Sequence, residues 1–205
     1  WRWCDQLIAA CKEQQVPALP YQAGSWGPAK AEVLIEKTSG VGMSKRRIFS
    51  SRGELDTSLA QEICSQLQAG LDTNGTATLV VSGGSTPKGL FAALSAANLD
   101  WKNITVLLAD ERWVDESHDD SNTAMVKSLL LQGAAAGAHW IDFGAGSTDV
   151  ERELERVKHE VSVLGTFDVV IFCMGNDTHT ASLFPFSIQL GEGSTTDAVA
   201  LMTQP

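Results

Sequence analysis

The chain has 205 residues, of which 43% are hydrophobic, and a formal net charge of −10 at pH 7. That length can bury one core and leave a small extra segment. The acidic balance argues against a nucleic-acid-binding surface, although an anionic small substrate needs only local positive potential. Since no apolar run is long enough to cross a membrane, we expect neither nucleic acid nor membrane as a partner.

The four cysteines give no sign of a metal or disulfide framework. Cys4, Cys11, Cys64 and Cys173 form no CxxC pair and have no metal-like spacing with the four histidines. We therefore expect reduced thiols, a cytoplasmic location, and neither metal nor cofactor.

Residues 1–42 differ in pattern from the rest. Residues 1–15 can form an amphipathic helix, prolines interrupt the next stretch, residues 29–36 suit a short helix, and residues 38–42 read as a linker. The YQAGSWGP stretch resembles the extreme C-terminus of glucose-6-phosphate dehydrogenase, without that family's catalytic or dinucleotide-binding parts. We expect residues 1–42 to be a remnant of this kind plus a linker, with a functional link to that enzyme.

From Met43 onward, short apolar runs alternate with amphipathic stretches. Leu55, Leu59, Ile63 and Leu67 recur every four residues and predict a helix ending near Gly70. Further helices are predicted at 87–97, 121–131 and 150–164, and strands at 47–50, 77–81, 104–109, 169–172 and 198–202. Such alternation predicts an α/β fold, a mostly parallel sheet with helices on both faces.

A glycine-rich loop follows the strand at 77–81 and precedes a helix. Gly83 and Gly84 allow the backbone to approach a ligand closely, and the first turn of the helix offers N–H groups to an anion. The loop is not a Walker A motif. It predicts a phosphate-binding site, with a tight turn capped by Ser85 as the alternative. The candidate residues are Ser82, Gly83, Gly84, Ser85, Thr86 and Lys88.

Charged residues follow the strand at 104–109. Arg112 can contact a phosphate or a carbonyl oxygen in a bidentate manner. Asp110 can hold Arg112 or accept a hydrogen bond from a sugar hydroxyl. Residues 119–122 suit a helix cap, and Asn122 is a candidate for facing the site. The alternative is a surface ion cluster.

A third polar turn follows the strand at 169–172. It carries Asp177 and His179, and a histidine can both take and give a proton near neutral pH. Asp177 can orient His179. The alternative is an ordinary loop histidine. The carboxyl ends of parallel strands meet at one edge of a sheet, where open α/β proteins bind their ligands.

Three motifs together resemble the 6-phosphogluconolactonase family over residues 43–205: SGGSTPKGLF, ADERWV with its later SN, and MGNDTHTASLFP. The resemblance implies metal-free hydrolysis of 6-phosphogluconolactone, a sugar phosphate of the pentose phosphate pathway. It implies that His179 is the general base, that Arg112 stabilises negative charge, and that residues 82–86 bind the 6-phosphate.

Two alternatives stay open. A glucosamine-6-phosphate deaminase or isomerase shares the fold and the phosphate loop, and Asp110 would suit it. A non-catalytic sugar-phosphate-binding remnant is the other, because Cys173 and Thr178 stand where the family pattern GMGxDGHT has glycines. The family pattern also continues beyond Pro205, so we expect a truncated domain.

Overall fold

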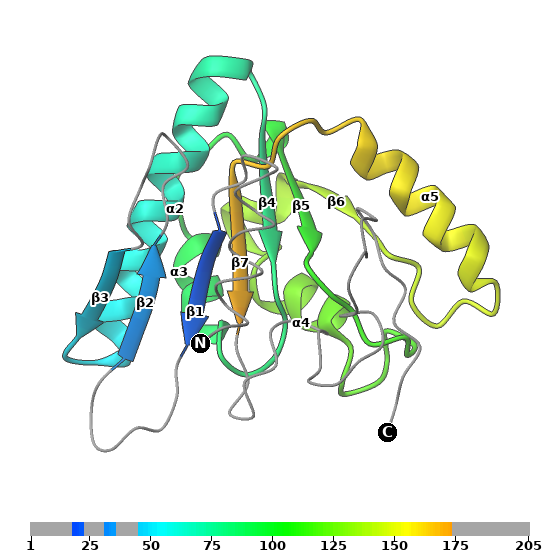
Figure 1. Cartoon of the computed structure of the whole chain (residues 1–205), viewed down its shortest axis with the longest axis horizontal. Helices are drawn as coiled ribbons and strands as arrows, with labels where there is room; N and C mark the ends of the chain where they lie inside the picture. Colours follow the sequence, from blue (N-terminus) through cyan, green and yellow to red (C-terminus); the bar gives the residue numbers. More distant parts are fainter. Residues whose placement is uncertain (1–17, 23–30, 36–44, 174–205) are drawn as a thin grey trace, which may run out of the picture.

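The structure is a computed structural model that describes residues 18–22, 31–35 and 45–173. In this part of the chain, seven strands form one sheet in the order β3-β2-β1-β7-β4-β5-β6 (Figure 1). The strands are β1 (Ala18–Gln22), β2 (Ala31–Ile35), β3 (Lys45–Phe49), β4 (Ala77–Val81), β5 (Ile104–Leu108), β6 (His139–Ile141) and β7 (Val169–Cys173).

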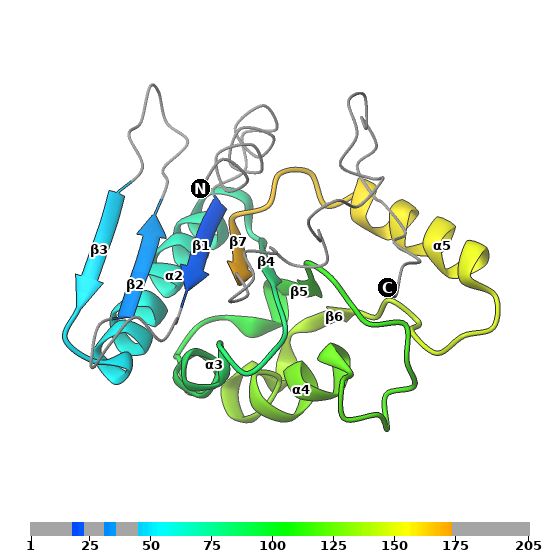
Figure 2. The same cartoon turned by 60° about the horizontal axis from the view of Figure 1, so that its bottom comes forward.

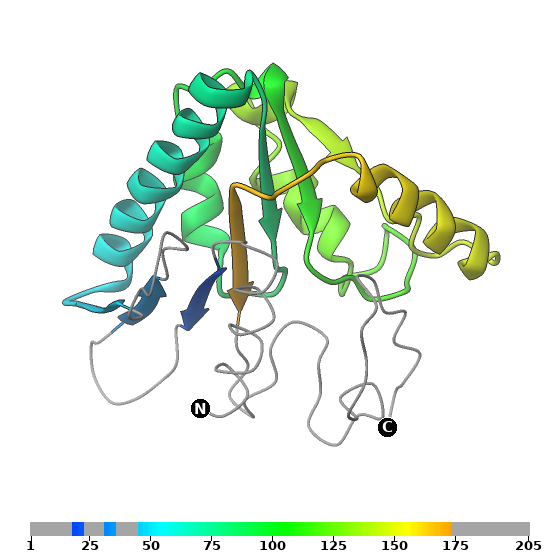
Figure 3. The same cartoon turned by 45° about the horizontal axis from the view of Figure 1, so that its top comes forward.

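Most neighbouring strands run parallel. β7 pairs in parallel with both β1 and β4, β4 with β5, and β5 with β6, whereas β2 is antiparallel to β1 and β3. The arrowheads of β4, β5 and β7 therefore point to one edge of the sheet (Figure 3). This confirms the predicted mostly parallel α/β sheet and sets the carboxyl ends of these strands at one edge.

Helices cover both faces, as predicted. The helices are α2 (Arg52–Asn74), α3 (Lys88–Ser95), α4 (Asn122–Leu129) and α5 (Val150–Ser162), with short 3₁₀ turns η1 (Trp101–Asn103) and η2 (Gly133–Gly137). α3 and α4 lie on one side of the sheet and α5 on the other (Figure 2).

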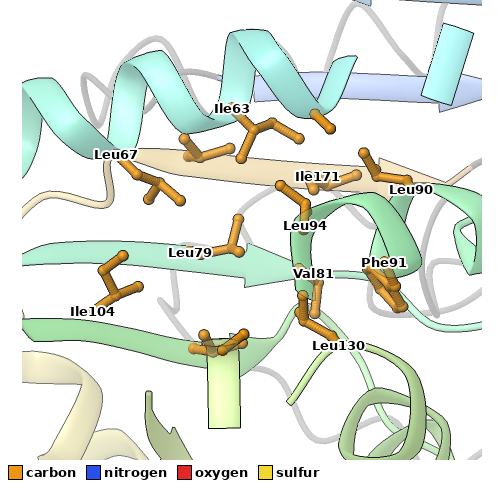
Figure 4. Packing of buried hydrophobic residues seen from close by; sticks show 14 of the residues in the cluster. Ile63, Leu67, Leu79, Val81, Leu90, Phe91, Leu94, Ile104, Leu130 and Ile171 are labelled. Carbon is orange, nitrogen blue, oxygen red and sulfur yellow. The ribbon is translucent and has the colours of Figure 1, made fainter. Parts of the chain in front are cut away.

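Each face has its own apolar cluster because successive strand residues point to opposite faces. Leu79 and Val81 of β4 join the larger cluster with α2, α3 and α4 (Figure 4). Val80, between them, joins the smaller cluster, against which Val161 of α5 packs. Since β4 and β7 are covered on both faces, their sequences do not alternate: β7 is apolar throughout, and Thr78 is the single polar residue of β4.

α2 shows how local signals determine an element. The four predicted apolar positions, Leu55, Leu59, Ile63 and Leu67, are at most 1% exposed. The helix begins after Ser51, whose side chain accepts from the backbone N–H of Glu54. It runs past Gly70 and ends at Gly75, which has a φ of 75° and donates to the carbonyl of Leu71.

The first forty residues contribute strands where a helix and a turn were expected. Residues 29–36 were expected to form a short helix, but β2 lies there, hydrogen-bonded to β1 and β3 on its two sides. Pairing on both edges satisfies the backbone groups of a segment too short to form a stable helix alone. The helix expected at 1–15, the linker at 38–42 and the strand at 198–202 lie outside the described residues.

Candidate functional site

The glycine-rich loop leads from β4 into α3 at the carboxyl edge of the sheet. Gly84 has a φ of 87°, and a Cβ built there meets no atom within 4 Å. α3 begins after Pro87 with no side-chain hydrogen bond to its first turn. Ser85 is thus not the cap that the alternative interpretation expected. The start of α3 favours an anion through its N–H groups and helix dipole, and the carboxylate of Asp56 already lies against Gly89 in this turn.

The hydroxyl groups of this loop differ in exposure. Ser82 is 2% exposed, and its Oγ has no hydrogen-bond partner in the described part of the chain. A buried hydroxyl without a partner is rare in proteins and calls for an explanation. Thr86 is half-buried, whereas Ser85 and Lys88 are exposed.

Asn122 is a buried link between the glycine-rich loop and the charged loop. It is 2% exposed. Its Nδ2 donates to the carbonyl oxygen of Asp110 at 3.0 Å, and its Oδ1 accepts from Nη1 of Arg112 at 3.2 Å. The same side chain lies against Gly83. Asn122 is therefore buried beneath the two loops and contacts both of them, rather than facing solvent.

Arg112 lies on the exposed loop after β5, and two oxygen atoms orient it. Its Nη1 donates to Asn122 and also to the carbonyl oxygen of Asp120, each at 3.2 Å. The contact with Asn122 brings the guanidinium close to the glycine-rich loop. The structure thus places together two of the three sequence-predicted clusters.

Glu111 has a role that we did not predict. Its Oε1 accepts from the backbone N–H of Asn122 at 2.9 Å, and its Oε2 accepts from the N–H and hydroxyl of Thr123, both at 2.7 Å. Ser121 caps the same helix by accepting from the N–H of Ala124. Glu111 thus fixes the start of α4 and, with it, Asn122. The signal was an acidic residue preceding a helix start in the sequence, but it lay eleven residues upstream of Asn122.

A second unpredicted feature is an ion pair in the first turn of α2. Nε of Arg52 lies 3.0 Å from Oδ1 of Asp56. Asp56 is only 7% exposed, and its carboxylate lies against Gly89 in the first turn of α3. The signal in the sequence was an acidic residue beside Leu55, on the apolar side of a helix, with an arginine four residues before it.

The pKa of the thiol of Cys173, the last residue of β7, is shifted by burial and by the charges of two other residues. Burial raises the pKa of its thiol most, the nearby Asp110 raises it further, and Arg52 lowers it, for a result of about 12. The charges of Asp110 and Arg52 therefore both act on the end of β7. The turn with Asp177, Thr178 and His179 follows in the sequence but lies outside the described residues.

Other features of the described residues lie apart from this edge or are absent. A small hollow lies beside the charged loop and contains none of the predicted site residues; it is lined by Val114, Glu116, Ser121, Thr123, Asp142 and Ala145. Within residues 18–22, 31–35 and 45–173, no three His, Cys, Asp or Glu side chains gather as a metal site. No helix there has the length and apolar character to span a bilayer.

The sheet and the described loops after β4 and β5 define a class: an open α/β protein whose candidate binding site lies at the carboxyl edge. The family follows from comparison with known proteins. The chain belongs to the family described as glucosamine-6-phosphate isomerases/6-phosphogluconolactonase, whose model matches residues 50–205.

Similar proteins point to one branch of this family. The chain is 44% identical to a 6-phosphogluconolactonase of Pseudomonas aeruginosa over 75% of this chain and 63% of that protein. It is 42% identical to one from Neisseria meningitidis, over 67% of this chain and 60% of the relative. The crystal structure of a 6-phosphogluconolactonase from Shewanella baltica has a TM-score of 0.65 at 42% identity, over 69% of this chain and 61% of that one.

The chain thus spans about three fifths of the length of the relatives it matches. A monomeric glucosamine-6-phosphate deaminase, 21% identical with a TM-score of 0.52, shares the fold.

Proposed function

We propose that this chain hydrolyses 6-phospho-D-glucono-1,5-lactone to 6-phospho-D-gluconate. The observation that carries the proposal is the loop around Gly84, where a glycine with a φ of 87° precedes a helix whose N-cap residue makes no side-chain hydrogen bond. Arg112 is tied to this loop through Asn122. A sugar phosphate fits such a site, because the phosphate can bind the loop while the ring extends toward Arg112 and the end of β7.

The proposed chemistry needs one base and groups that stabilise an oxyanion. His179, oriented by Asp177, takes a proton from water as the water oxygen attacks C1 of the lactone. Arg112 and backbone N–H groups stabilise the negative charge on the carbonyl oxygen. The tetrahedral intermediate then collapses, the bond from C1 to the ring oxygen breaks, and His179 returns its proton to the ring oxygen. Asp110 accepts a hydrogen bond from a sugar hydroxyl.

The relatives named above favour a lactone over an amino sugar. They carry the name 6-phosphogluconolactonase at 42–44% identity, whereas the deaminase is 21% identical. The sequence SLFP after His179 also favours a 6-phosphogluconolactonase over a deaminase.

The direct test is lactone hydrolysis by the chain, with the spontaneous rate subtracted. We expect hydrolysis above background that His179→Ala reduces to the spontaneous rate. Full activity in His179→Ala would reject the proposed base. Ammonia release from glucosamine 6-phosphate at a comparable rate would reject the choice of substrate. If the chain binds 6-phosphogluconate but hydrolyses no lactone, the non-catalytic alternative is favoured.

For the N-terminal part, we propose a remnant similar to the end of glucose-6-phosphate dehydrogenase over residues 1–42, a functional link to that enzyme, and a cytoplasmic location. The lactonase-like domain then covers residues 43–205. Starting the chain at Met43 tests this division, and hydrolysis per folded molecule should stay unchanged. Because β1 and β2 lie between β3 and β7 in the sheet, a chain that no longer folds would assign both strands to the domain instead.

A further inference from the structure

Arg52 lies at the same edge of the sheet as the glycine-rich loop. It is the first residue of α2, the helix that leads into β4. A helix that precedes a parallel strand begins at the carboxyl edge and ends at the amino edge. α3, which follows β4, begins at the carboxyl edge as well. The starts of α2 and α3 therefore lie at the same edge of the sheet, where β4 and β7 also end (Figure 1).

The carboxylate of Asp56 holds the Arg52 side chain at the start of α2, and Asp56 itself packs against the start of α3. Nε of Arg52 lies 3.0 Å from Oδ1 of Asp56, which is almost fully buried. Asp56 lies so close to Gly89 that a Cβ at residue 89 would overlap it. The pair is thus wedged against the first turn of α3, while the arginine side chain remains 37% exposed. A planar guanidinium held at one edge loses less freedom on binding an anion.

The acidic net charge of the chain bears on the role of Arg52. The chain carries a net charge of −10, so an anionic substrate needs cations placed at its site. In the described part of the chain, Lys88 at the start of α3 and Arg112 on the loop after β5 supply positive charge at this edge of the sheet. Arg52 supplies it from the start of α2, and its charge acts on Cys173 at the end of β7.

We propose that Arg52, positioned by Asp56, binds the phosphate group of the substrate together with the glycine-rich loop. Arg52 is thus a residue for phosphate specificity, contributed by α2 rather than by any of the three motifs. The proposal rests on the sugar-phosphate substrate proposed above.

The test compares two ligands in the full chain by calorimetry: 6-phosphogluconate, and gluconate, which lacks the phosphate. Arg52→Gln removes the charge and keeps hydrogen-bonding capacity toward Asp56. It should weaken 6-phosphogluconate binding about tenfold, the usual scale for a hydrogen bond to a charged group, and leave gluconate binding unchanged. In lactone hydrolysis, KM should rise and kcat should change little. Lys102→Gln is the matched control, since it removes an exposed cation at the opposite edge, before β5.

Each outcome is decisive. If Arg52→Gln keeps the wild-type preference for 6-phosphogluconate over gluconate, the proposed role of Arg52 is overturned and the proposed function stays intact. No preference in the wild type would overturn the proposed function and this inference together. If Arg52→Gln does not fold, Arg52→Lys decides. A lysine cannot contact Asp56 and make a two-pronged phosphate contact together, so about a threefold loss of preference supports the proposal and unchanged preference overturns it.

Discussion

Asn122 fills the space that a side chain at residue 83 would need, so Gly83 and Asn122 interlock at the junction of two loops. Asn122 belongs to α4, whereas Gly83 lies in the loop from β4 to α3. Because the same asparagine also contacts Arg112 and Asp110, it transmits a shift in one loop to the other. The spacing between the proposed phosphate site and Arg112 thus depends on a single buried side chain.

This interlock predicts coupled mutations. Gly83→Ala should lower the free energy of unfolding by about 1–3 kcal/mol, because the new methyl group overpacks against Asn122. Asn122→Ala should also destabilise, by about 1–3 kcal/mol, because it removes the part-buried hydrogen bonds to Arg112 and to the carbonyl oxygen of Asp110. In the double variant the methyl group has room, so the combined loss should be smaller than the sum in urea unfolding. Additive losses would contradict the interlock.

Gly84 and Gly75 form a matched pair for testing the phosphate site. Their φ values are 87° and 75°, and neither position has an atom within 4 Å of a built Cβ. Changing either to alanine should cost about 1–2 kcal/mol through left-handed backbone strain alone. Only Gly84→Ala should also weaken 6-phosphogluconate binding, since its methyl group projects into the space in front of the loop. Equal binding by both variants would remove Gly84 from the ligand site.

Glu111 should contribute mainly to stability. Glu111→Gln replaces one carboxylate oxygen that accepts from the start of α4, which should cost about 1–3 kcal/mol in chemical denaturation. Glu116→Gln is the control, because Glu116 forms an exposed ion pair with Lys127, worth at most about 1 kcal/mol. Equal losses from the two substitutions would argue against the capping role of Glu111.

The thiol of Cys173 should react slowly in the folded protein. With a pKa of about 12, almost none of it is thiolate at pH 8, and the thiolate is the nucleophile. Alkylation by iodoacetamide at pH 8, followed by mass spectrometry of the peptide, should label Cys173 slowly before urea is added and rapidly afterward. Burial also raises the pKa of Cys64, so Cys64 should behave similarly. Rapid labelling of Cys173 without urea would contradict the burial of its thiol.

The elements predicted correctly are those with strong local signals. The four-residue spacing from Leu55 to Leu67 predicted α2, and β4, β5 and β7 were predicted from short runs of apolar residues. Three strands were missed. β6 has only three residues, and β1 and β2 depend on pairing with each other and with β3 and β7. Such pairing is set by distant parts of the chain, which local propensity does not contain.

The candidate site, too, was predicted only where the local sequence carried the signal. The sequence predicted a glycine-rich loop between a strand and a helix, and β4 and α3 confirm that arrangement, whereas anion binding by the loop stays a prediction. It did not predict that Glu111 accepts from the start of α4, or that Asp56 holds Arg52 against Gly89. These contacts join residues whose proximity follows only from the packing of α2, α3 and α4. The roles of Asp177 and His179 stay predictions.

The place of β1 in the sheet also sets the order in which the protein can fold. β1 is hydrogen-bonded to β7, with Ala18 opposite Val170, so two segments from opposite ends of the described chain must meet. Closing so long a loop carries a large entropic cost, and contacts of this kind form late. During synthesis, β1 leaves the ribosome long before β7 has been made. Until β7 emerges, the free edge of β1 must be kept from pairing with the edges of other nascent chains.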